Sequence, residues 1–412
     1  MSLQGPILIV ADKTATGLVQ ALAGAGAFPV IETTWRDASA ALAEIKPSAI
    51  VASEPTDVDA AAALTQKLAK AAPIIPMLMC LRDDKPSPLL DALTMSEAAP
   101  AEQLIARLGG LVRLRALHAT VIGRARTLKA DRNIVSDMPS GDPLDDATVL
   151  LVGRGRYHAT LSVAVGERMG VMGALSIEAA ARCLTARDID GIVIGDGLPL
   201  GAVDAFLTVL AEDSRFRDLP VAVLGGAVAN ALPNLVCAHD PQLLLERAVP
   251  LIRLRTFETA LKRLLQSIES KGMLDPHTGL LNNKAFGQEL DRAIEDALAR
   301  GVALSLARFS FDQQIERRAS MDAARLMSRL VRSVDFAHRQ DDGSILFAFA
   351  DTDLRSAHVA ARRLASVLKH TMLHRDREEA RVSPAVTLAT LKPTDTALTL
   401  LASVAPRPVA AA

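Results

Sequence analysis

The sequence predicts an α/β chain in which two parallel-sheet domains are followed by an α+β domain, and three observations carry this prediction. Short apolar strands alternate with helical stretches through the first two thirds of the 412 residues, an order typical of parallel sheets. The same order occurs twice, with a segment rich in Pro, Gly and Asp in between. In the last third, a β-α-β-β-α-β order favours an antiparallel sheet covered by helices.

The first domain is expected to span residues 1–130. Its strands are short apolar runs at 6–12, 46–53 and 74–81. They alternate with Ala- and Leu-rich helical stretches at 16–27, 59–72 and 100–125. Residues 131–146 contain SDMPSGDPLDD, which has the composition of a linker.

The second domain is expected at 147–270 and repeats this order, with strands at 147–153, after 190 and at 219–226, and helices at 163–170 and 240–272. The third domain is expected at 271–405. It has strands at 304–311 and 383–391, helices at 322–333 and 355–370, and a hairpin between the helices. The Asp-Gly pair in the hairpin suits a tight turn, because Gly tolerates positive φ. The tail at 406–412 is expected to be disordered.

Composition excludes several functions. Only 3% of the residues are aromatic and the net charge is −1, which argues against a nucleic-acid surface. Three cysteines far apart in the sequence predict neither a disulfide framework nor a zinc site. No signal peptide and no apolar run long enough to span a bilayer is recognised. We expect a cytoplasmic protein without membrane insertion.

Both parallel-sheet domains resemble response-regulator receiver domains, whose sheet is five-stranded and flavodoxin-like. The resemblance implies acids after the first strand that hold Mg²⁺, and an Asp after the third strand that accepts a phosphoryl group. Ser53 and Gly195 stand at the two acceptor positions, so no phosphoacceptor and no metal site is predicted. The neighbouring acids Asp12 and Asp196 are interpreted as strand-end or turn carboxylates, and the two domains as a dimerisation and partner-binding platform.

The third domain resembles a GGDEF domain, the fold of diguanylate cyclases. LDPHTGLLNNKAF matches the family opening DxLTGLxNRRxF at six positions: Asp275, Thr278, Gly279, Leu280, Asn282 and Phe286. An active member needs an Asp-x-Asp pair on its first strand, where this chain has Arg308 and Ser310. A cation there repels the metal. The signature itself is replaced by Asp341, Asp342, Gly343, Ser344 and Ile345, so no catalytic residue is predicted.

The resemblance also implies a binding site for cyclic di-GMP, an RxxD motif that precedes the signature, and this chain retains the motif. Arg332 and Asp335 have the family spacing to Asp341. An Arg can donate two hydrogen bonds to guanine O6 and N7, and a carboxylate can accept from the N1–H and N2–H₂ edge. By resemblance Arg363 joins them from the following helix, with Arg362 as its neighbour. The plain alternative is an ion pair on a solvated helix end.

Degenerate receivers, a degenerate signature and a retained RxxD motif together resemble the catalytically inactive PleD-like effectors of cyclic di-GMP. The resemblance implies a homodimer recruited to a cell pole, with partners such as an RcdA-like adaptor in the ClpXP pathway that degrades the regulator CtrA. Two alternatives stay open: a dimeric scaffold that ignores nucleotides, and a residual diguanylate cyclase.

Overall fold

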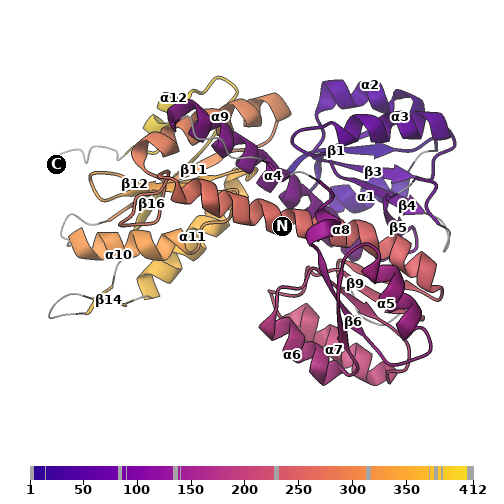
Figure 1. The fold of residues 1–412 in the computed structure, drawn as a ribbon. Helices are drawn as coiled ribbons and strands as arrows, with labels where there is room; N and C mark the ends of the chain where they lie inside the picture. Colours follow the sequence, from indigo (N-terminus) through magenta and orange to yellow (C-terminus); the bar gives the residue numbers. More distant parts are fainter. Residues whose placement is uncertain are drawn as a thin grey trace, which may run out of the picture.

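The computed structural model describes residues 4–13, 15–81, 86–89, 91–132, 138–139, 141–226, 232–311, 317–370, 372–374, 379–381 and 384–405. The expected tail at 406–412 and much of the expected linker at 131–146 lie outside these residues. The predicted fold class is confirmed within them: two parallel five-stranded sheets precede an antiparallel sheet (Figure 1).

The first sheet has the order β2-β1-β3-β4-β5, and all its pairs are parallel, which is the flavodoxin-like order. Its central strands are completely buried apolar runs that helices cover from both sides. The elements are β1 (Gln4–Val10), α1 (Thr16–Gly24), β2 (Phe28–Thr33), α2 (Trp35–Ile45), β3 (Ala49–Ser53), α3 (Val58–Ala69), β4 (Met77–Leu81), β5 (Leu93–Ser96) and α4 (Ala101–Arg132).

The second sheet has the order β10-β9-β8-β6-β7 and repeats the first, again with parallel pairs only. A 3-10 turn at Pro143–Asp146 leads into it. The elements are β6 (Thr148–Val152), α5 (His158–Gly166), β7 (Gly170–Ala174), α6 (Ile177–Ala186), β8 (Gly191–Ile194), α7 (Leu200–Glu212), β9 (Val221–Leu224), β10 (Leu235–Ala238) and α8 (Pro241–Ser270).

The third sheet is antiparallel, in the order β12-β13-β11-β16, and it contains the predicted β-α-β-β-α-β unit. Helices α10 and α11 cover one face of this sheet, and α9 covers the other. The elements are α9 (Asn283–Arg300), β11 (Ser305–Ser310), α10 (Arg317–Ser328), β12 (Phe336–Arg339), β13 (Ile345–Phe349), α11 (Leu354–His370), the short pair β14 (Met372–His374) and β15 (Glu379–Arg381), β16 (Ala385–Thr390) and α12 (Ala397–Ser403).

Two long helices connect the parts of the molecule. Helix α4 leaves the first domain and α8 leaves the second, and they pack against each other on their way to the third domain (Figure 1). There Leu117, Val121 and Leu265 share one apolar cluster with Phe286 and Leu290 of α9. Near the other end of α4, the buried Arg107 donates to the carbonyls of Thr94, Pro233 and Leu235, which ties the first domain to the second. The third domain therefore rests on helices that belong to both parallel-sheet domains.

Candidate functional site

The hairpin of β12 and β13 forms as predicted, with Gly343 at φ +84° in its loop. The Gln340 amide donates to the Ser344 carbonyl at 2.8 Å and the Gly343 amide donates to the Gln340 carbonyl at 3.0 Å. Positive φ favours Gly here, and a Cβ on Gly343 would also lie 3.1 Å from the Ser320 hydroxyl. Turn chemistry therefore accounts for this glycine in full.

The two acids of the loop have different surroundings. Asp342 forms an ion pair with Arg308 of β11 and accepts from the Ser344 amide at 2.9 Å and its hydroxyl at 2.6 Å. These hydrogen bonds and the Arg308 charge hold the pKa of Asp342 below its usual value against the effect of burial. Asp341 is exposed. Arg308, at the position where the resemblance implies a metal ligand, is thus the cation of an internal ion pair.

The RxxD motif lies in a loop. The sequence predicts a helix that continues to residue 333, but α10 ends at Ser328, so Arg332 and Asp335 do not share a helix face. A short turn joins them instead, because the Asp335 amide donates to the Arg332 carbonyl at 3.1 Å. Arg332 is exposed, whereas Asp335 is only 3% exposed at the start of edge strand β12. The motif therefore presents a solvated cation beside a buried carboxyl.

Burial has the largest effect on the pKa of Asp335. It raises the pKa of the carboxyl to about 7, although the Arg332 charge and a hydrogen bond from the Ala350 amide, 3.1 Å from Oδ1, both act to lower it. A carboxyl with such a pKa loses its proton near neutral pH. Groups perturbed in this way cluster at functional sites. The other carboxyl oxygen has no hydrogen-bond partner among the described residues and is available to a ligand.

Arg332 and Asp335 line a pocket of about 280 Å³ between the third domain and the connecting helices. The wall opposite the motif is built by Arg124 of α4 and by Lys262, Gln266 and Glu269, which repeat along one face of α8. The remaining lining is Leu265, Leu274, Gly279, Leu280, Leu281, Ser328, Val331, Ser333, Phe336 and Ala337. This pocket is large enough for several polar groups of a nucleotide, but not for all of a dinucleotide.

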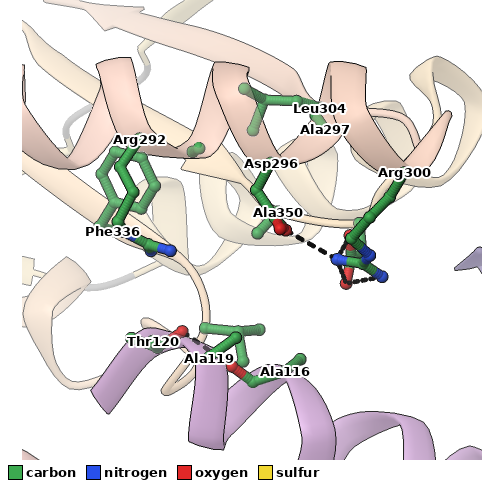
Figure 2. Close-up of a pocket in the computed structure, with 13 residues that line it drawn as sticks. Ala116, Ala119, Thr120, Arg292, Asp296, Ala297, Arg300, Leu304, Phe336 and Ala350 are labelled. Carbon is green, nitrogen blue, oxygen red and sulfur yellow. Dashed lines mark hydrogen bonds and ion pairs between the residues drawn. The ribbon is translucent and has the colours of Figure 1, made fainter. Parts of the chain in front are cut away.

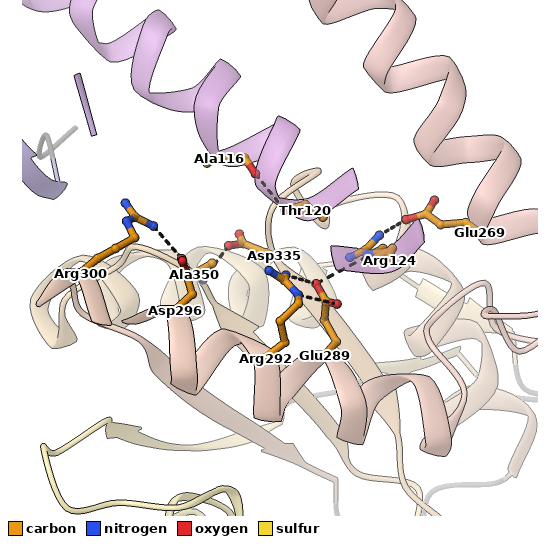
Figure 3. Close-up of polar contacts among 10 residues, drawn as sticks. All are labelled: Ala116, Thr120, Arg124, Glu269, Glu289, Arg292, Asp296, Arg300, Asp335 and Ala350. Atoms are coloured by element: carbon orange, nitrogen blue, oxygen red, sulfur yellow. Dashed lines mark hydrogen bonds and ion pairs between the residues drawn. The ribbon is translucent and has the colours of Figure 1, made fainter. Parts of the chain in front are cut away.

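An ion-pair network lies at the inner side of this pocket (Figure 3). Arg124, with a side chain 3% exposed, pairs with Glu269 of α8 and lies 3.6 Å from Glu289 of α9. Glu289 also accepts two hydrogen bonds from Arg292, at 2.6 and 3.3 Å. Sequence reasoning missed this wall, since Arg124 and Glu269 are 145 positions apart and the connecting helices were not expected to reach the motif.

Arg362 and Arg363 are exposed neighbours on α11, and neither lines the pocket. Helix α11 packs on the face of the sheet opposite α9. The described structure thus brings Arg332 and Asp335 together, while the contribution of Arg363 to the same site stays a prediction.

A smaller cavity of about 40 Å³ separates α4 from α9 (Figure 2). At its end Arg300 pairs with Asp296 at 2.8 Å and with Asp351 at 3.2 Å, and its other terminal nitrogen donates to the Ser48 hydroxyl of the first domain at 2.9 Å. These contacts fix the third domain directly against the first.

The two receiver-like domains use their strand-end acids in turns. Asp12 accepts from the Trp35 amide at 3.2 Å and from the Thr56 hydroxyl. Asp196 accepts from the amides of Arg156 at 3.0 Å and Tyr157 at 3.2 Å, just before α5. Both observations agree with the turn-residue interpretation.

Ser53 ends β3, with its hydroxyl 3.4 Å from the Val10 carbonyl, and Gly195 directly follows β8. Each therefore stands at the carboxyl end of a central strand, where the receiver resemblance places its acceptor. Among the described residues no group of three or more His, Cys, Asp or Glu side chains is arranged to hold a metal ion. No helix within the described part of the chain has the length and apolarity to cross a membrane.

No protein-family model matches the chain, and no curated protein matches its sequence. Among solved structures, the coiled coil and GGDEF domain of DgcB from Caulobacter crescentus in complex with c-di-GMP is 21% identical, covers 34% of this chain and 81% of that chain, and has a TM-score of 0.30.

The diguanylate cyclase SiaD with its activator SiaC from Pseudomonas aeruginosa is 19% identical, with coverages of 36% and 61% and a TM-score of 0.32. The FimX GGDEF domain from Pseudomonas aeruginosa is also 19% identical, with coverages of 32% and 88% and a TM-score of 0.30. Likenesses of this size carry no argument about activity, and the fold class rests on the sheet topology above.

Proposed function

We propose that this chain is a non-catalytic effector that binds cyclic di-GMP at Arg332 and Asp335. The observation that carries the proposal is the juxtaposition of an exposed guanidinium and a buried carboxyl of raised pKa at one pocket, at the register where GGDEF domains have their product site. Arg332 would donate to guanine O6 and N7, and the ionised Asp335 would accept from the N1–H and N2–H₂ edge.

The Arg308–Asp342 ion pair supports the absence of cyclase activity. Two divalent ions held by carboxylates are needed to join two GTP molecules, and a guanidinium at the ligand position opposes both of them. Both acids of the loop are exposed, but Asp342 is engaged by that guanidinium. We expect no cyclic di-GMP when the protein is incubated with GTP and Mg²⁺ or Mn²⁺.

Calorimetric titration tests the binding site. Wild-type protein should bind cyclic di-GMP, and Arg332→Ala should weaken binding roughly 10- to 100-fold, because a charged, bidentate pair with guanine is worth about 1–3 kcal/mol. Arg329→Ala is the matched control: it removes one exposed arginine three positions away that is outside the pocket lining, and it should bind like wild type. If Arg332→Ala and Arg329→Ala weakened binding equally, the loss would reflect general electrostatics and not a specific contact at the RxxD motif.

Wild-type protein that is folded and gives no heat with cyclic di-GMP would favour the nucleotide-independent scaffold instead. We also propose a homodimer that assembles through the receiver-like pair, to be tested by sedimentation with and without ligand. Recruitment to a cell pole and partners of the RcdA and ClpXP kind are proposed from the resemblance to PleD-like effectors such as PopA. Loss of polar fluorescence on Arg332→Ala in a tagged strain would support that role.

A further inference from the structure

The outward side of α11 is strongly basic, although the net charge of the whole chain is only −1. The helix contains no Asp or Glu between Leu354 and His370. Its exposed polar residues recur at helical spacing and therefore share one face. This basic face of α11 consists of Arg355, His358, Arg362, Arg363, Lys369 and His370. Such a local concentration of positive charge attracts an anionic partner.

The opposite side of α11 holds the helix in place. Four of its side chains are buried against the antiparallel sheet: Ala357, Ala361, Leu364 and Leu368. They are spread over the length of the helix, so the basic face points away from the sheet from end to end. Figure 1 shows α11 beside α10, on the side of the third domain opposite α9 and α12. The basic face of α11 is therefore a preformed surface of this domain.

The acids nearest to α11 in the sequence and on α10 are engaged elsewhere. Asp353, just before the helix, accepts from the Ser356 amide at 2.7 Å and caps its first turn. On α10, Asp322 pairs with Arg325 at 3.1 Å. The Arg and Lys side chains of the basic face form no ion pair with any residue that the structure describes. Their charge is therefore available to a partner.

The shape of this face favours a flat partner. Helix α11 lies along the sheet as a ridge about 25 Å long and does not protrude as a DNA recognition helix does. It has no aromatic side chain on which a base could stack. None of its cations lines the pocket at the RxxD motif or the cavity between α4 and α9, so neither offers a groove for an acidic peptide at this face.

The composition of this face favours a lipid surface. Val359 is 66% exposed among the cations, and Leu354 is 47% exposed at the start of the helix. At a bilayer interface, cations contact the lipid phosphates while neighbouring aliphatic groups contact the less polar region beneath them. Clusters of about four to eight Lys and Arg residues on an amphipathic helix are typical of proteins that bind anionic lipids.

We propose that the basic face of α11 is a docking surface for the headgroups of an anionic lipid bilayer. The contact is peripheral, because the apolar side of the helix is packed on the sheet and is not free to insert. Each Lys or Arg near an anionic surface strengthens binding about fivefold, so the four Arg and Lys side chains together give a gain of roughly a thousandfold. This is the strength of a reversible association, and it does not depend on the cyclic di-GMP site.

Co-sedimentation of the full chain with lipid vesicles tests this inference. Wild-type protein should bind vesicles of phosphatidylglycerol and phosphatidylcholine in equal parts, and should not bind phosphatidylcholine alone. The binding should be lost at about 0.5 M NaCl, where the Debye length is only about 4 Å. The double variant Arg355→Gln, Lys369→Gln should bind roughly 25-fold more weakly, because it removes two of the four charges and neither residue belongs to the proposed ligand site.

The matched control is the double variant Lys70→Gln, Arg182→Gln. It removes one exposed lysine from the first domain and one exposed arginine from the second, and it should bind vesicles like wild type. Thermal melting of each variant confirms that it is folded. Cyclic di-GMP titrations of the α11 double variant should match wild type.

Three results would overturn the lipid-docking surface and leave the proposed function intact. The first is wild-type protein that does not bind the mixed vesicles, or that binds phosphatidylcholine alone equally well. The second is an equal loss in the two double variants, since binding would then follow net charge and not α11. The third is wild-type protein that binds duplex DNA or polyglutamate through α11 but not the vesicles, which would assign the basic face to another polyanion.

Discussion

The proposed contact between Asp335 and guanine makes the expected affinity for cyclic di-GMP depend on pH in a calculable way. The carboxyl has a pKa of about 7 and must be ionised to accept from both guanine donors. A ligand that binds only the ionised form has an apparent dissociation constant equal to the intrinsic one divided by the ionised fraction. That fraction is roughly nine-tenths at pH 8 and roughly 3% at pH 5.5.

We therefore expect cyclic di-GMP to bind ~30-fold more weakly at pH 5.5 than at pH 8, a difference of about 2 kcal/mol. Calorimetry at constant ionic strength measures it, and neither the phosphodiesters nor guanine N1 titrates in this window. Asp335→Asn is the control, and it should bind weakly at both pH values. Wild-type affinity that is equal at pH 5.5 and 8 would refute the role given to the Asp335 carboxylate.

Two further predictions concern stability. In the folded chain Asp335 holds its proton up to about pH 7, whereas an unfolded Asp holds it only up to about pH 4. Between these pH values the folded chain binds more protons than the unfolded chain, so the free energy of unfolding falls as the pH rises from about 4 to 7. Asp335→Asn should remove this loss and melt at a higher temperature than wild type at pH 8. The expected gain in the free energy of unfolding is up to roughly 4 kcal/mol, and a variant that melted like wild type across pH 4–8 would contradict this prediction. Gly155→Ala should lose about 1–2 kcal/mol in chemical denaturation, because its Cβ would lie 2.1 Å from the Asp196 carboxyl carbon and displace the acid that holds the start of α5. Gly201→Ala, with open space around its Cβ, should be neutral or stabilising, and equal losses in both variants would contradict the steric argument.

Much of the fold follows from local patterns. Continuous apolar runs predicted the central strands β1, β3, β4, β6, β8 and β9, since strands buried on both faces need no polar alternation. The edge strands of the two parallel sheets, β2, β5, β7 and β10, were not located individually. They are short or partly exposed, and their hydrophobic signal is correspondingly weak.

Helix ends were less predictable than helices. Apolar periodicity in RLMSRLVRS predicts a helix up to residue 333, but α10 ends at Ser328. The Arg329 and Leu330 amides then donate to carbonyls three positions earlier, which is the pattern of a turn. By contrast, α9 has readable boundary signals that sequence reasoning overlooked: Asn282 accepts from the Ala285 amide at its start, and Gly301 adopts φ +62° at its end.

In the candidate site, too, local sequence patterns predicted some features and missed those that depend on packing. Arg332 and Asp335 were found from motif register, and the Asp-Gly turn from its chemistry. The pocket wall could not be found this way, because Arg124, Lys262 and Glu269 meet the motif only through the packing of α4 and α8 against α9. Spacing along a sequence carries no information on contacts between helices that belong to different domains.

Locating the ligand in a structure of the full chain with cyclic di-GMP tests the central claim most directly. The account predicts one guanine between Arg332 and Asp335. A ligand bound elsewhere on the chain, or an empty RxxD pocket at saturating cyclic di-GMP and pH 8, would contradict it.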